Sequence, residues 1–328
     1  MKAVIPAAGI GTRLRPHTLN KPKALLQVAG KPILAHIMDD LTAAGIDGFV
    51  LIVGYHGDEV RNWFGRERPD LDITFVEQTE RLGLGHAIWT AREALGDEAF
   101  FCILGDTILK ADYPSLLASR HSMIAVREVD DPRRFGVVEM DGDNVRRFVE
   151  KPEVPPSNLA IVGAYLFRDA AALWKALDRI VGEDIRTRGE YQLTDALQMM
   201  VEEGIPFNTV PVTDWYDCGK KETWLQTNRV LLERTGGGDE PEGIISPCCV
   251  APDAVIRNST VGPNVSVGPG TIIEDCSLSD CVIGAGSRLV GCRLDQSLVG
   301  NECMLTGISG EINVGDFSEA NAETDSKG

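Results

Sequence analysis

The chain has 328 residues, with 32 basic and 49 acidic side chains and a formal net charge of −17. This length is enough for two domains that each bury a core. The acidic balance argues against a nucleic-acid partner or an anionic membrane surface, because either would favour a basic face.

No apolar run approaches the ~20 residues of a membrane span, and the first residues read as a strand and lack the features of a signal peptide. We therefore expect a soluble, cytoplasmic protein. The eight cysteines contain no C-x-x-C pair, and the chain is too long and too apolar for a disulfide scaffold. Neither a disulfide framework nor a structural zinc site is expected.

Apolar strands alternate with helical patterns from Met1 to about Leu104. The expected strands are Ala3–Ile5, Phe49–Val53, Ile73–Val76 and Phe100–Leu104. The expected helices are Ile33–Ala44, Asp58–Phe64 and His86–Leu95. This order predicts parallel pairing in a Rossmann-like, doubly wound α/β sheet, with ligands beyond the carboxyl ends of the strands.

A glycine-rich turn directly follows the first strand. Gly9 and Gly11 allow the backbone to bend tightly and to bring its N–H groups close to an anion. Arg13 and Arg15 follow, and a guanidinium can bind two phosphate oxygens at once. With Lys23 beyond them, the stretch predicts a polyphosphate cradle, although it matches neither the P-loop nor the dinucleotide fingerprint.

Asp106 comes directly after the fourth strand, in Leu104-Gly105-Asp106. A carboxylate at a strand's carboxyl end suits Mg²⁺, which takes few carboxylates and completes its shell with phosphate oxygens. An aspartate after a glycine also suits an ordinary turn. On this residue alone both readings stay open.

The middle of the chain predicts a hairpin, with strands over 136–139 and 145–152 joined by the turn Asp141-Gly142-Asp143-Asn144. A Gly- and acid-rich linker follows Leu232. Beyond it, Val-Gly or Ile-Gly pairs at 267, 283, 299 and 314 recur every sixteen, sixteen and fifteen residues. Aliphatic residues divide each period into five- or six-residue steps, which predicts a parallel β-helix with Cys276 and Cys292 stacked inside.

Several of these segments together resemble the sugar-1-phosphate nucleotidyltransferases, the NDP-sugar pyrophosphorylases. The resemblance is carried by Gly9-x-Gly11-Thr12-Arg13-Leu14-x-Pro16, Lys23-x-Leu25-Leu26, Gly30-Lys31-Pro32, Leu104-Gly105-Asp106, Glu150-Lys151-Pro152 and Trp215-x-Asp217-x-Gly219. It implies a mixed sheet followed by a left-handed β-helix. The domains expected are a catalytic domain over 1–234, a linker over 235–243, the β-helix over 244–318 and a polar tail over 319–328.

The resemblance also implies the roles of individual residues. Those implied to bind the nucleotide are Ala8, Gly9, Gly11, Thr12, Arg13, Gln78 and Gly83. Those implied to bind the sugar phosphate are Gly136, Glu150, Lys151 and Val162, although Glu150 and Lys151 alone would read as a solvated strand end. Mg²⁺ would be held by Asp106 and Asp217. The catalytic residues implied are Arg13, Lys23 and Asp106.

The implied reaction joins an NTP and a sugar 1-phosphate into an NDP-sugar and pyrophosphate. Ala7-Ala8-Gly9 and Leu84-Gly85-His86-Ala87 favour the UTP:glucose-1-phosphate branch, whereas the β-helix favours the long-form glucose-1-phosphate thymidylyltransferases. The choice between dTTP and UTP stays open, as do the sugar, the oligomer size and any feedback ligand.

Two other functions remain to be weighed. A non-catalytic regulatory or scaffolding paralogue would have no physical need for Arg13, Lys23, Asp106, Lys151 and Asp217 together. An acyl-transferring β-helix usually relies on a histidine base, and no histidine follows His121. The β-helix is therefore expected to serve assembly of a homo-oligomer or allostery.

Overall fold

The computed structural model describes residues 1–235 and 241–322. The described chain forms two compact units. Unit 1 holds Met1–Gly9 and Ile37–Trp215, and unit 2 holds Ile10–His36 and the chain from Tyr216 onward. Much of the predicted linker, at 236–240, and of the predicted tail, at 323–328, lies outside the described residues.

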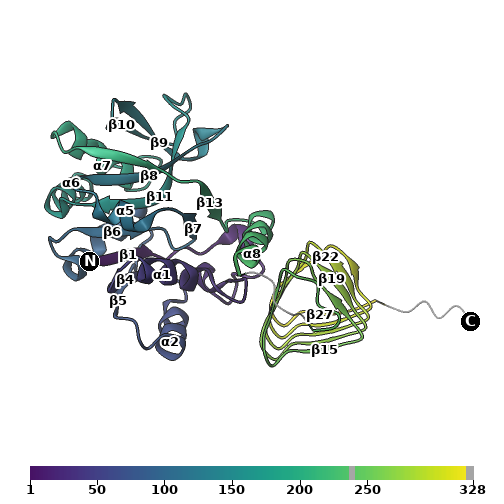
Figure 1. Ribbon diagram of the computed structural model, residues 1–328. Coiled ribbons are helices and arrows are strands. Elements are labelled where there is room, and N and C mark those ends of the chain that lie inside the picture. The colour runs from purple at the N-terminus through teal and green to yellow at the C-terminus, as the bar shows by residue number, and fades with distance from the viewer. Residues whose placement is uncertain (236–240, 323–328) are drawn as a thin grey trace, which may run out of the picture. The chain divides into compact units, whose positions relative to one another are not determined.

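Unit 1 contains a nine-stranded mixed sheet in the order β5-β4-β1-β6-β11-β8-β12-β10-β9 (Figure 1). In chain order the strands are β1 (Lys2–Pro6), β4 (Gly48–Val53), β5 (Ile73–Glu77), β6 (Phe100–Ile103), β8 (Ser122–Glu128), β9 (Gly136–Asp141), β10 (Asn144–Glu150), β11 (Leu159–Phe167) and β12 (Phe207–Pro211). The first four pair in parallel, as predicted. β11 runs antiparallel to β6 and β8, which makes the sheet mixed.

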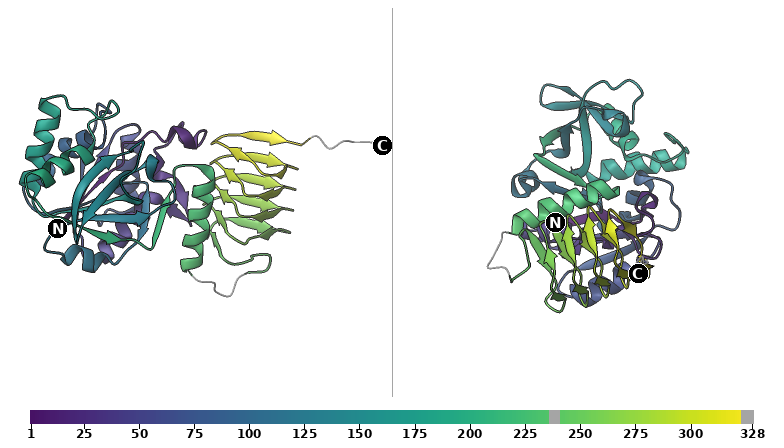
Figure 2. Two further views of the ribbon diagram at one scale, coloured as in Figure 1. Left: turned by 90° about the horizontal axis from the view of Figure 1, so that it is seen from above. Right: turned by 90° about the vertical axis from the view of Figure 1, so that its right-hand side faces the viewer.

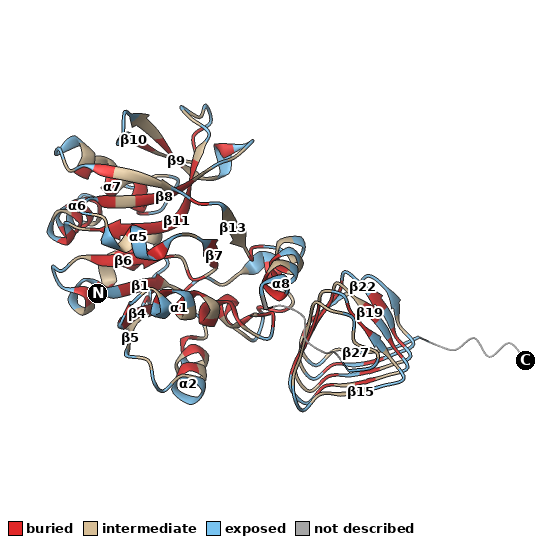
Figure 3. Ribbon diagram, viewed as in Figure 1, coloured by how far each residue is buried: buried red, intermediate tan, exposed pale blue. Residues whose placement is uncertain are grey.

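The helices associated with this sheet are α1 (Ile33–Ala43), α2 (Gly57–Glu67), α3 (Leu84–Thr90), α4 (Arg92–Leu95), α5 (Tyr113–Ala118), α6 (Ala170–Gly182) and α7 (Leu193–Glu202). All six residues of β4 are buried, as expected of a strand covered on both faces (Figure 3). The single helix predicted over His86–Leu95 is two helices, because the chain turns at Ala91, whose N–H donates to Ile88 O at 3.0 Å.

Aromatic packing holds α6 against the sheet. The ring of Trp174 stacks on Phe100 with centroids 5.6 Å apart, and Phe100 also contacts Phe167. Trp174 Nε1 donates to Gly96 O at 2.8 Å, so its one polar atom is satisfied inside the core. No helix of the described residues has both the length and the apolar composition to cross a bilayer.

The other short elements are η1 (Thr12–Leu14), η2 (Lys23–Leu25), β2 (Gln27–Val28), β3 (Lys31–Pro32), β7 (Thr107–Lys110), η3 (Pro132–Arg134) and β13 (Asp214–Asp217). The helix α8 (Lys221–Thr235) has 15 residues and belongs to unit 2. β13 carries the chain from unit 1 into unit 2.

Unit 2 contains a parallel β-helix built of three sheets (Figure 2). The first has β14 (Cys248–Val250), β17 (Val265–Val267), β20 (Val282–Ile283), β23 (Leu298–Val299) and β26 (Asn313–Val314). The second has β15 (Val255–Arg257), β18 (Ile272–Glu274), β21 (Arg288–Val290), β24 (Met304–Thr306) and β27 (Glu319–Asn321). The third has β16 (Thr260–Val261), β19 (Ser277–Ser279), β22 (Arg293–Asp295) and β25 (Ser309–Gly310).

Each coil turns its corners through residues in the left-handed backbone conformation. One series of corners is Gly270, Gly286, Glu302 and Phe317, all with positive φ. Inside the coils, the Cys292 N–H lies 3.2 Å from Cys276 Sγ, which confirms the stacking predicted for these two cysteines. The coils continue through β27, so the last strand extends beyond the boundary predicted at residue 318.

Candidate active site

Three loops meet at the carboxyl ends of neighbouring strands in unit 1. β1 lies between β4 and β6, so the segments that follow them are brought together. Ala7 N–H donates to Ile52 O at 2.8 Å, and Gly105 N–H donates to Pro6 O at 3.1 Å. A Cβ on Gly105 would lie 2.9 Å from Pro6 O, so glycine permits this close approach. The structure therefore places Ala8 and Asp106 on segments that contact each other.

Gln78 and Gly83, two of the residues predicted to bind the nucleotide, also lie together. Gln78 is buried, and its Nε2 donates to Gly83 O at 3.4 Å. Gly83 has φ 111° and precedes α3, and a Cβ there would lie 2.6 Å from Tyr191 O. A side chain at position 83 would thus be both strained and obstructed.

His86 lies in the first turn of α3 and is buried, with no hydrogen-bond partner for its Nδ1. Burial lowers the pKa of His86 below 6.5, although Glu80 acts in the opposite direction. The imidazole is therefore neutral at pH 7. A neutral, buried side chain fits a role in packing and positioning its neighbours.

A polar cluster forms where β9 pairs with β10. Glu150 is opposite Gly136 in the pair. Glu150 Oε2 accepts a hydrogen bond from Thr194 Oγ1 at 3.0 Å, and Glu150 Oε1 lies 3.1 Å from Lys151 Nζ. A Cβ on Gly136 would lie 3.0 Å from Thr194 Cγ2 and 3.1 Å from Glu150 Oε2. Glycine at 136 keeps the space over the carboxylate open.

Lys151 holds an unusual backbone conformation. Its φ is 42°, in the left-handed region that non-glycine residues seldom adopt. The backbone is fixed on both sides, because Lys151 N–H donates to Phe135 O at 3.0 Å and Arg188 Nη2 donates to Lys151 O at 2.7 Å. Strain held in this way is typical of a functional position.

Val162 connects this cluster to Asp106. The pairing of β11 with β8 shifts register between Ile161 and Tyr165, so β11 bulges at Val162 and Gly163. Gly163 O accepts the Leu104 N–H at 2.9 Å, two residues before Asp106. The bulge brings the Val162 backbone beside the segment that carries Asp106.

No role for Thr194 was predicted from the sequence. Its neighbour Asp195 has a buried Oδ2 with no hydrogen-bond partner. Burial raises the pKa of Asp195, and the charge of Glu150 adds to this.

Four predicted residues, Gly11, Thr12, Arg13 and Lys23, belong to unit 2, on a segment that we call the arginine loop, Gly11–Lys23. Gly11 has φ 67°, and a Cβ there would lie 3.1 Å from Thr18 Cγ2 and 3.2 Å from Lys23 Cβ. Thr18 Oγ1 donates to Gly11 O at 2.8 Å. The loop is therefore folded back on itself, while Thr12 and Arg13 are exposed.

Lys23 and Asp217 form a pair although they are far apart in sequence. Lys23 is buried, and its Nζ lies 3.6 Å from Asp217 Oδ1. That oxygen is itself buried and has no hydrogen-bond partner. A Cβ on Gly219 would lie 2.7 Å from it, so glycine leaves room beside the carboxylate.

The predicted metal ligands Asp106 and Asp217 belong to unit 1 and unit 2 respectively. Among the residues that the structure describes, no three histidine, cysteine or carboxylate side chains form a metal site. Mg²⁺ does not require such a cage, since it is usually held by one or two carboxylates together with substrate phosphates. Asp217 Oδ1 is buried and accepts no hydrogen bond although Lys23 Nζ lies 3.6 Å away, so it is an oxygen that a cation could still satisfy.

Comparisons with known proteins point to one chemistry. A model of the nucleotidyl transferase family matches residues 2–234. A low-salt glycan biosynthesis nucleotidyltransferase of Haloferax volcanii is 35% identical over 334 residues, covering 92% of this chain and 92% of that protein. Glucose-1-phosphate thymidylyltransferase of Streptomyces antibioticus is 34% identical over 323 residues, covering 94% and 89%. The crystal structure of a UDP-glucose pyrophosphorylase complexed with UDP-glucose is 26% identical with a TM-score of 0.61, covering 71% and 98%.

Proposed function

Because this chain belongs to the nucleotidyl transferase family, we propose that it transfers a nucleotidyl group from dTTP or UTP to glucose 1-phosphate. The products are the NDP-sugar and pyrophosphate. The observation that carries the proposal is the cluster of Glu150, Lys151 and Thr194, in which an ammonium group lies 3.1 Å from a carboxylate. An ammonium suits a phosphate and a carboxylate suits a sugar hydroxyl, so one cluster can bind both ends of a sugar phosphate.

In the proposed reaction an oxygen of the sugar phosphate attacks the α-phosphorus in line. A new P–O bond forms, and the bond from the α-phosphorus to the bridging oxygen of pyrophosphate breaks. The nucleophile is already anionic at neutral pH, so no general base is needed. Alignment and charge stabilisation therefore carry the rate.

Each role follows from the charge of the group. Arg13 would bind the leaving pyrophosphate, because its guanidinium can pair with two phosphate oxygens. Lys23 would stabilise charge at the α-phosphate, and Lys151 would hold the sugar phosphate. The phosphate groups of the nucleotide would be bound along the turn formed by Ala8, Gly9, Gly11 and Thr12.

Gln78 and Gly83 would bind the base. A glutamine amide both donates and accepts, so it can pair with the edge of uracil or thymine. Because these two bases present the same edge, Gln78 by itself does not choose between UTP and dTTP. Gly136 and the Val162 backbone would line the sugar pocket.

Asp106 and Asp217 would hold Mg²⁺, which supplies positive charge against the triphosphate. The buried Asp217 Oδ1 without a hydrogen-bond partner supports this assignment. We also propose that the chain acts in the cytoplasm as a homo-oligomer. A monomer in light scattering at micromolar concentration would contradict the oligomer.

The deciding experiment measures pyrophosphate release with dTTP, UTP, CTP, GTP and ATP, each paired with several sugar 1-phosphates, with and without Mg²⁺. We expect turnover with a pyrimidine triphosphate and glucose 1-phosphate, and only with Mg²⁺. Asp106→Asn should lower kcat/KM by about a hundredfold or more, because it removes a charge that holds the cation.

Asp112→Asn is the matched control, since Asp112 caps α5 through Ser115 N and lies outside the proposed site. It should leave kcat/KM unchanged. Nucleotide binding without turnover in any pair would instead support a regulatory paralogue.

A further inference from the structure

Consecutive coils of the β-helix approach each other closely at the glycines of the Val-Gly repeat. A Cβ on Gly284 would lie 2.4 Å from the backbone of Gly300, and a Cβ on Gly300 would lie 2.4 Å from Gly315 C. Gly315 is the last member of this column. A Cβ on Gly315 would lie 2.8 Å from Pro16 Cβ, so the arginine loop takes the place that a further coil would occupy.

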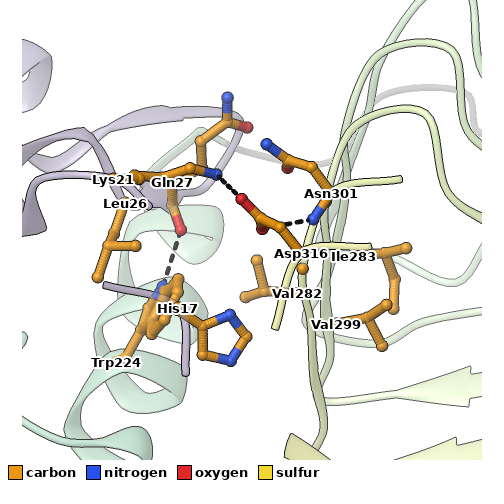
Figure 4. Close-up of a pocket in the computed structure, with 12 residues that line it drawn as sticks. His17, Lys21, Leu26, Gln27, Trp224, Val282, Ile283, Val299, Asn301 and Asp316 are labelled. Atoms are coloured by element: carbon orange, nitrogen blue, oxygen red, sulfur yellow. Dashed lines mark hydrogen bonds and ion pairs between the residues drawn. The ribbon is translucent and has the colours of Figure 1, made fainter. Parts of the chain in front are cut away.

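A column of hydrogen bonds beside these glycines ends in the same way. The Ala285 N–H donates to Asn301 Oδ1 at 3.0 Å, and the Asn301 N–H donates to Asp316 Oδ1 at 2.8 Å. Among the residues that the structure describes, Asp316 is the last member of this column, and its Oδ2 lies 3.3 Å from Lys21 Nζ (Figure 4).

A third contact joins the last coil to the loop. His17 is 5% exposed, and its Nε2 donates to Asn313 Oδ1 at 2.7 Å. The imidazole packs edge-on against Trp224 of α8, with centroids 5.1 Å apart. Trp224 Nε1 in turn donates to Gln27 O at 2.8 Å, which fixes the ring that supports His17.

These contacts border a small recess between the loop residues His17 and Lys21 and the coil residues Ile283, Val299 and Asp316 (Figure 4). The arginine loop is attached to the last coil through Pro16, His17 and Lys21. A single substitution at one of these contacts should therefore loosen the attachment.

The attached residues Pro16, His17 and Lys21 lie in the chain between Arg13 and Lys23, which are proposed to bind the nucleotide. Thr18 follows His17 and bonds to Gly11 O, and Lys23 contacts Gly11. Leu14 N–H also donates to Gly11 O at 2.9 Å, and His17 N–H donates to Leu14 O at 3.0 Å. A shift at His17 would thus move Gly11 and the turn that carries Arg13.

We infer that the last coil of the β-helix positions the arginine loop for nucleotide binding, with Asn313 and Asp316 as positioning residues that act through His17 and Lys21. This inference rests on the proposed function for the role of the loop. Pre-ordering the loop matters because a phosphate-binding loop that must order itself on binding loses affinity.

The test uses Asn313→Ala and Asp316→Asn in the full chain. The matched control is Glu311→Gln, which breaks another ion pair of the last coil, to Lys221 of α8 at 2.6 Å. In the first two variants we expect the KM for the nucleotide to rise about fivefold, as for loss of one hydrogen bond. The KM for the sugar 1-phosphate should stay unchanged, and the control should resemble the wild type in both.

Hydrogen exchange of the amides of 11–23 gives a readout that needs no activity. We expect it to accelerate about fivefold in Asn313→Ala and Asp316→Asn and not in Glu311→Gln. Unchanged exchange in both coil variants would overturn the inference whatever the activity. Accelerated exchange with an unchanged nucleotide KM would also overturn it, whereas accelerated exchange in a chain without turnover on any substrate would refute only the proposed function.

Discussion

Glu150 shows how single contacts shape the proposed sugar site. Its two carboxylate oxygens have different neighbours, since Oε2 accepts from Thr194 and Oε1 lies beside Lys151. Both neighbours hold the carboxylate in one orientation, with Gly136 leaving the space above it open. The orientation of Glu150 therefore depends on Thr194, a residue from another part of the chain.

Replacing Thr194 with valine tests this dependence. Thr194→Val keeps the shape of the side chain and removes a hydrogen bond to a carboxylate, so we expect the KM for the sugar 1-phosphate to rise roughly tenfold. The KM for the nucleotide should stay unchanged. Thr42→Val is the control, because it makes the same change of side chain and removes a hydroxyl hydrogen bond to a backbone carbonyl, Met38 O in α1. Equal kinetics of the two variants would contradict the assignment of Glu150.

We expect the stability of the folded protein to depend on pH through His17. Burial lowers the pKa of His17 from 6.5, and Lys21 adds to this, whereas the Asn313 hydrogen bond and the charge of Asp316 oppose it. Below pH 6.5 the unfolded chain binds a proton at His17 that the folded chain does not yet bind. The contribution of His17 to stability is therefore complete above pH 6.5 and is lost as the pH falls toward the folded-state pKa.

The measurement compares thermal unfolding midpoints at about pH 7.5 and about pH 5.5. The midpoint should fall less in His17→Gln than in the wild type. The buried His86 has a lowered pKa as well, but it contributes equally to both proteins. An identical fall in both proteins would rule out His17 as a source of the dependence.

At the scale of elements, the Val-Gly repeat has a steric cause. The glycines of the repeat lie where consecutive coils approach within contact distance of each other's backbone. A side chain there would meet backbone, which cannot rotate away. This explains why glycine recurs once per coil, while aliphatic residues such as Ile273 and Leu289 fill the interior.

Gly284→Ala should therefore destabilise the protein by about 3 kcal/mol, at the upper end for an overpacked core. We expect the opposite change in stability from Gly65→Ala, because Gly65 lies within α2 and a Cβ there would have no atom within 4 Å. It should stabilise the protein by up to about 1 kcal/mol through helix propensity. Denaturant unfolding checks both, and equal midpoints for the two variants would contradict this account.

At the scale of the whole molecule, a chain with more acidic than basic side chains carries a proposed site for anionic substrates. With a net charge of −17, the chain would have to hold phosphates through a few local cations.

The packing of the whole molecule also determines whether the cysteines are accessible. All eight lie in the described part of the chain, and each is a thiol.

Six of these thiols are buried, and only Cys248 and Cys249 are partly exposed. Burial also raises the pKa of Cys281 to about 12, which keeps that thiol unreactive. We expect at most two of the eight cysteines to react with a thiol reagent in the native protein, and all eight in denaturant. Rapid reaction of more than two in the native state would show that the β-helix interior opens.

The sequence by itself determined the features that repeat or lie close together along the chain. Alternating strands and helices predicted the parallel part of the sheet, because burial on both faces requires continuous apolar runs such as β4. The hairpin of β9 and β10 followed from an Asp-Gly turn. The β-helix followed from a period of about sixteen residues, since every coil must present the same glycine and the same aliphatic residues to its neighbours.

The tertiary structure alone decided which distant segments meet. It placed Thr194 on Glu150, Asp217 beside Lys23, and the last coil against the arginine loop. It also grouped residues 10–36 with the β-helix in one compact unit, although the sequence predicted a catalytic domain over 1–234. Periodicity reports which face of an element is buried, but not which partner covers it. Contacts across dozens or hundreds of residues depend on the packing of the whole chain, which no local pattern records.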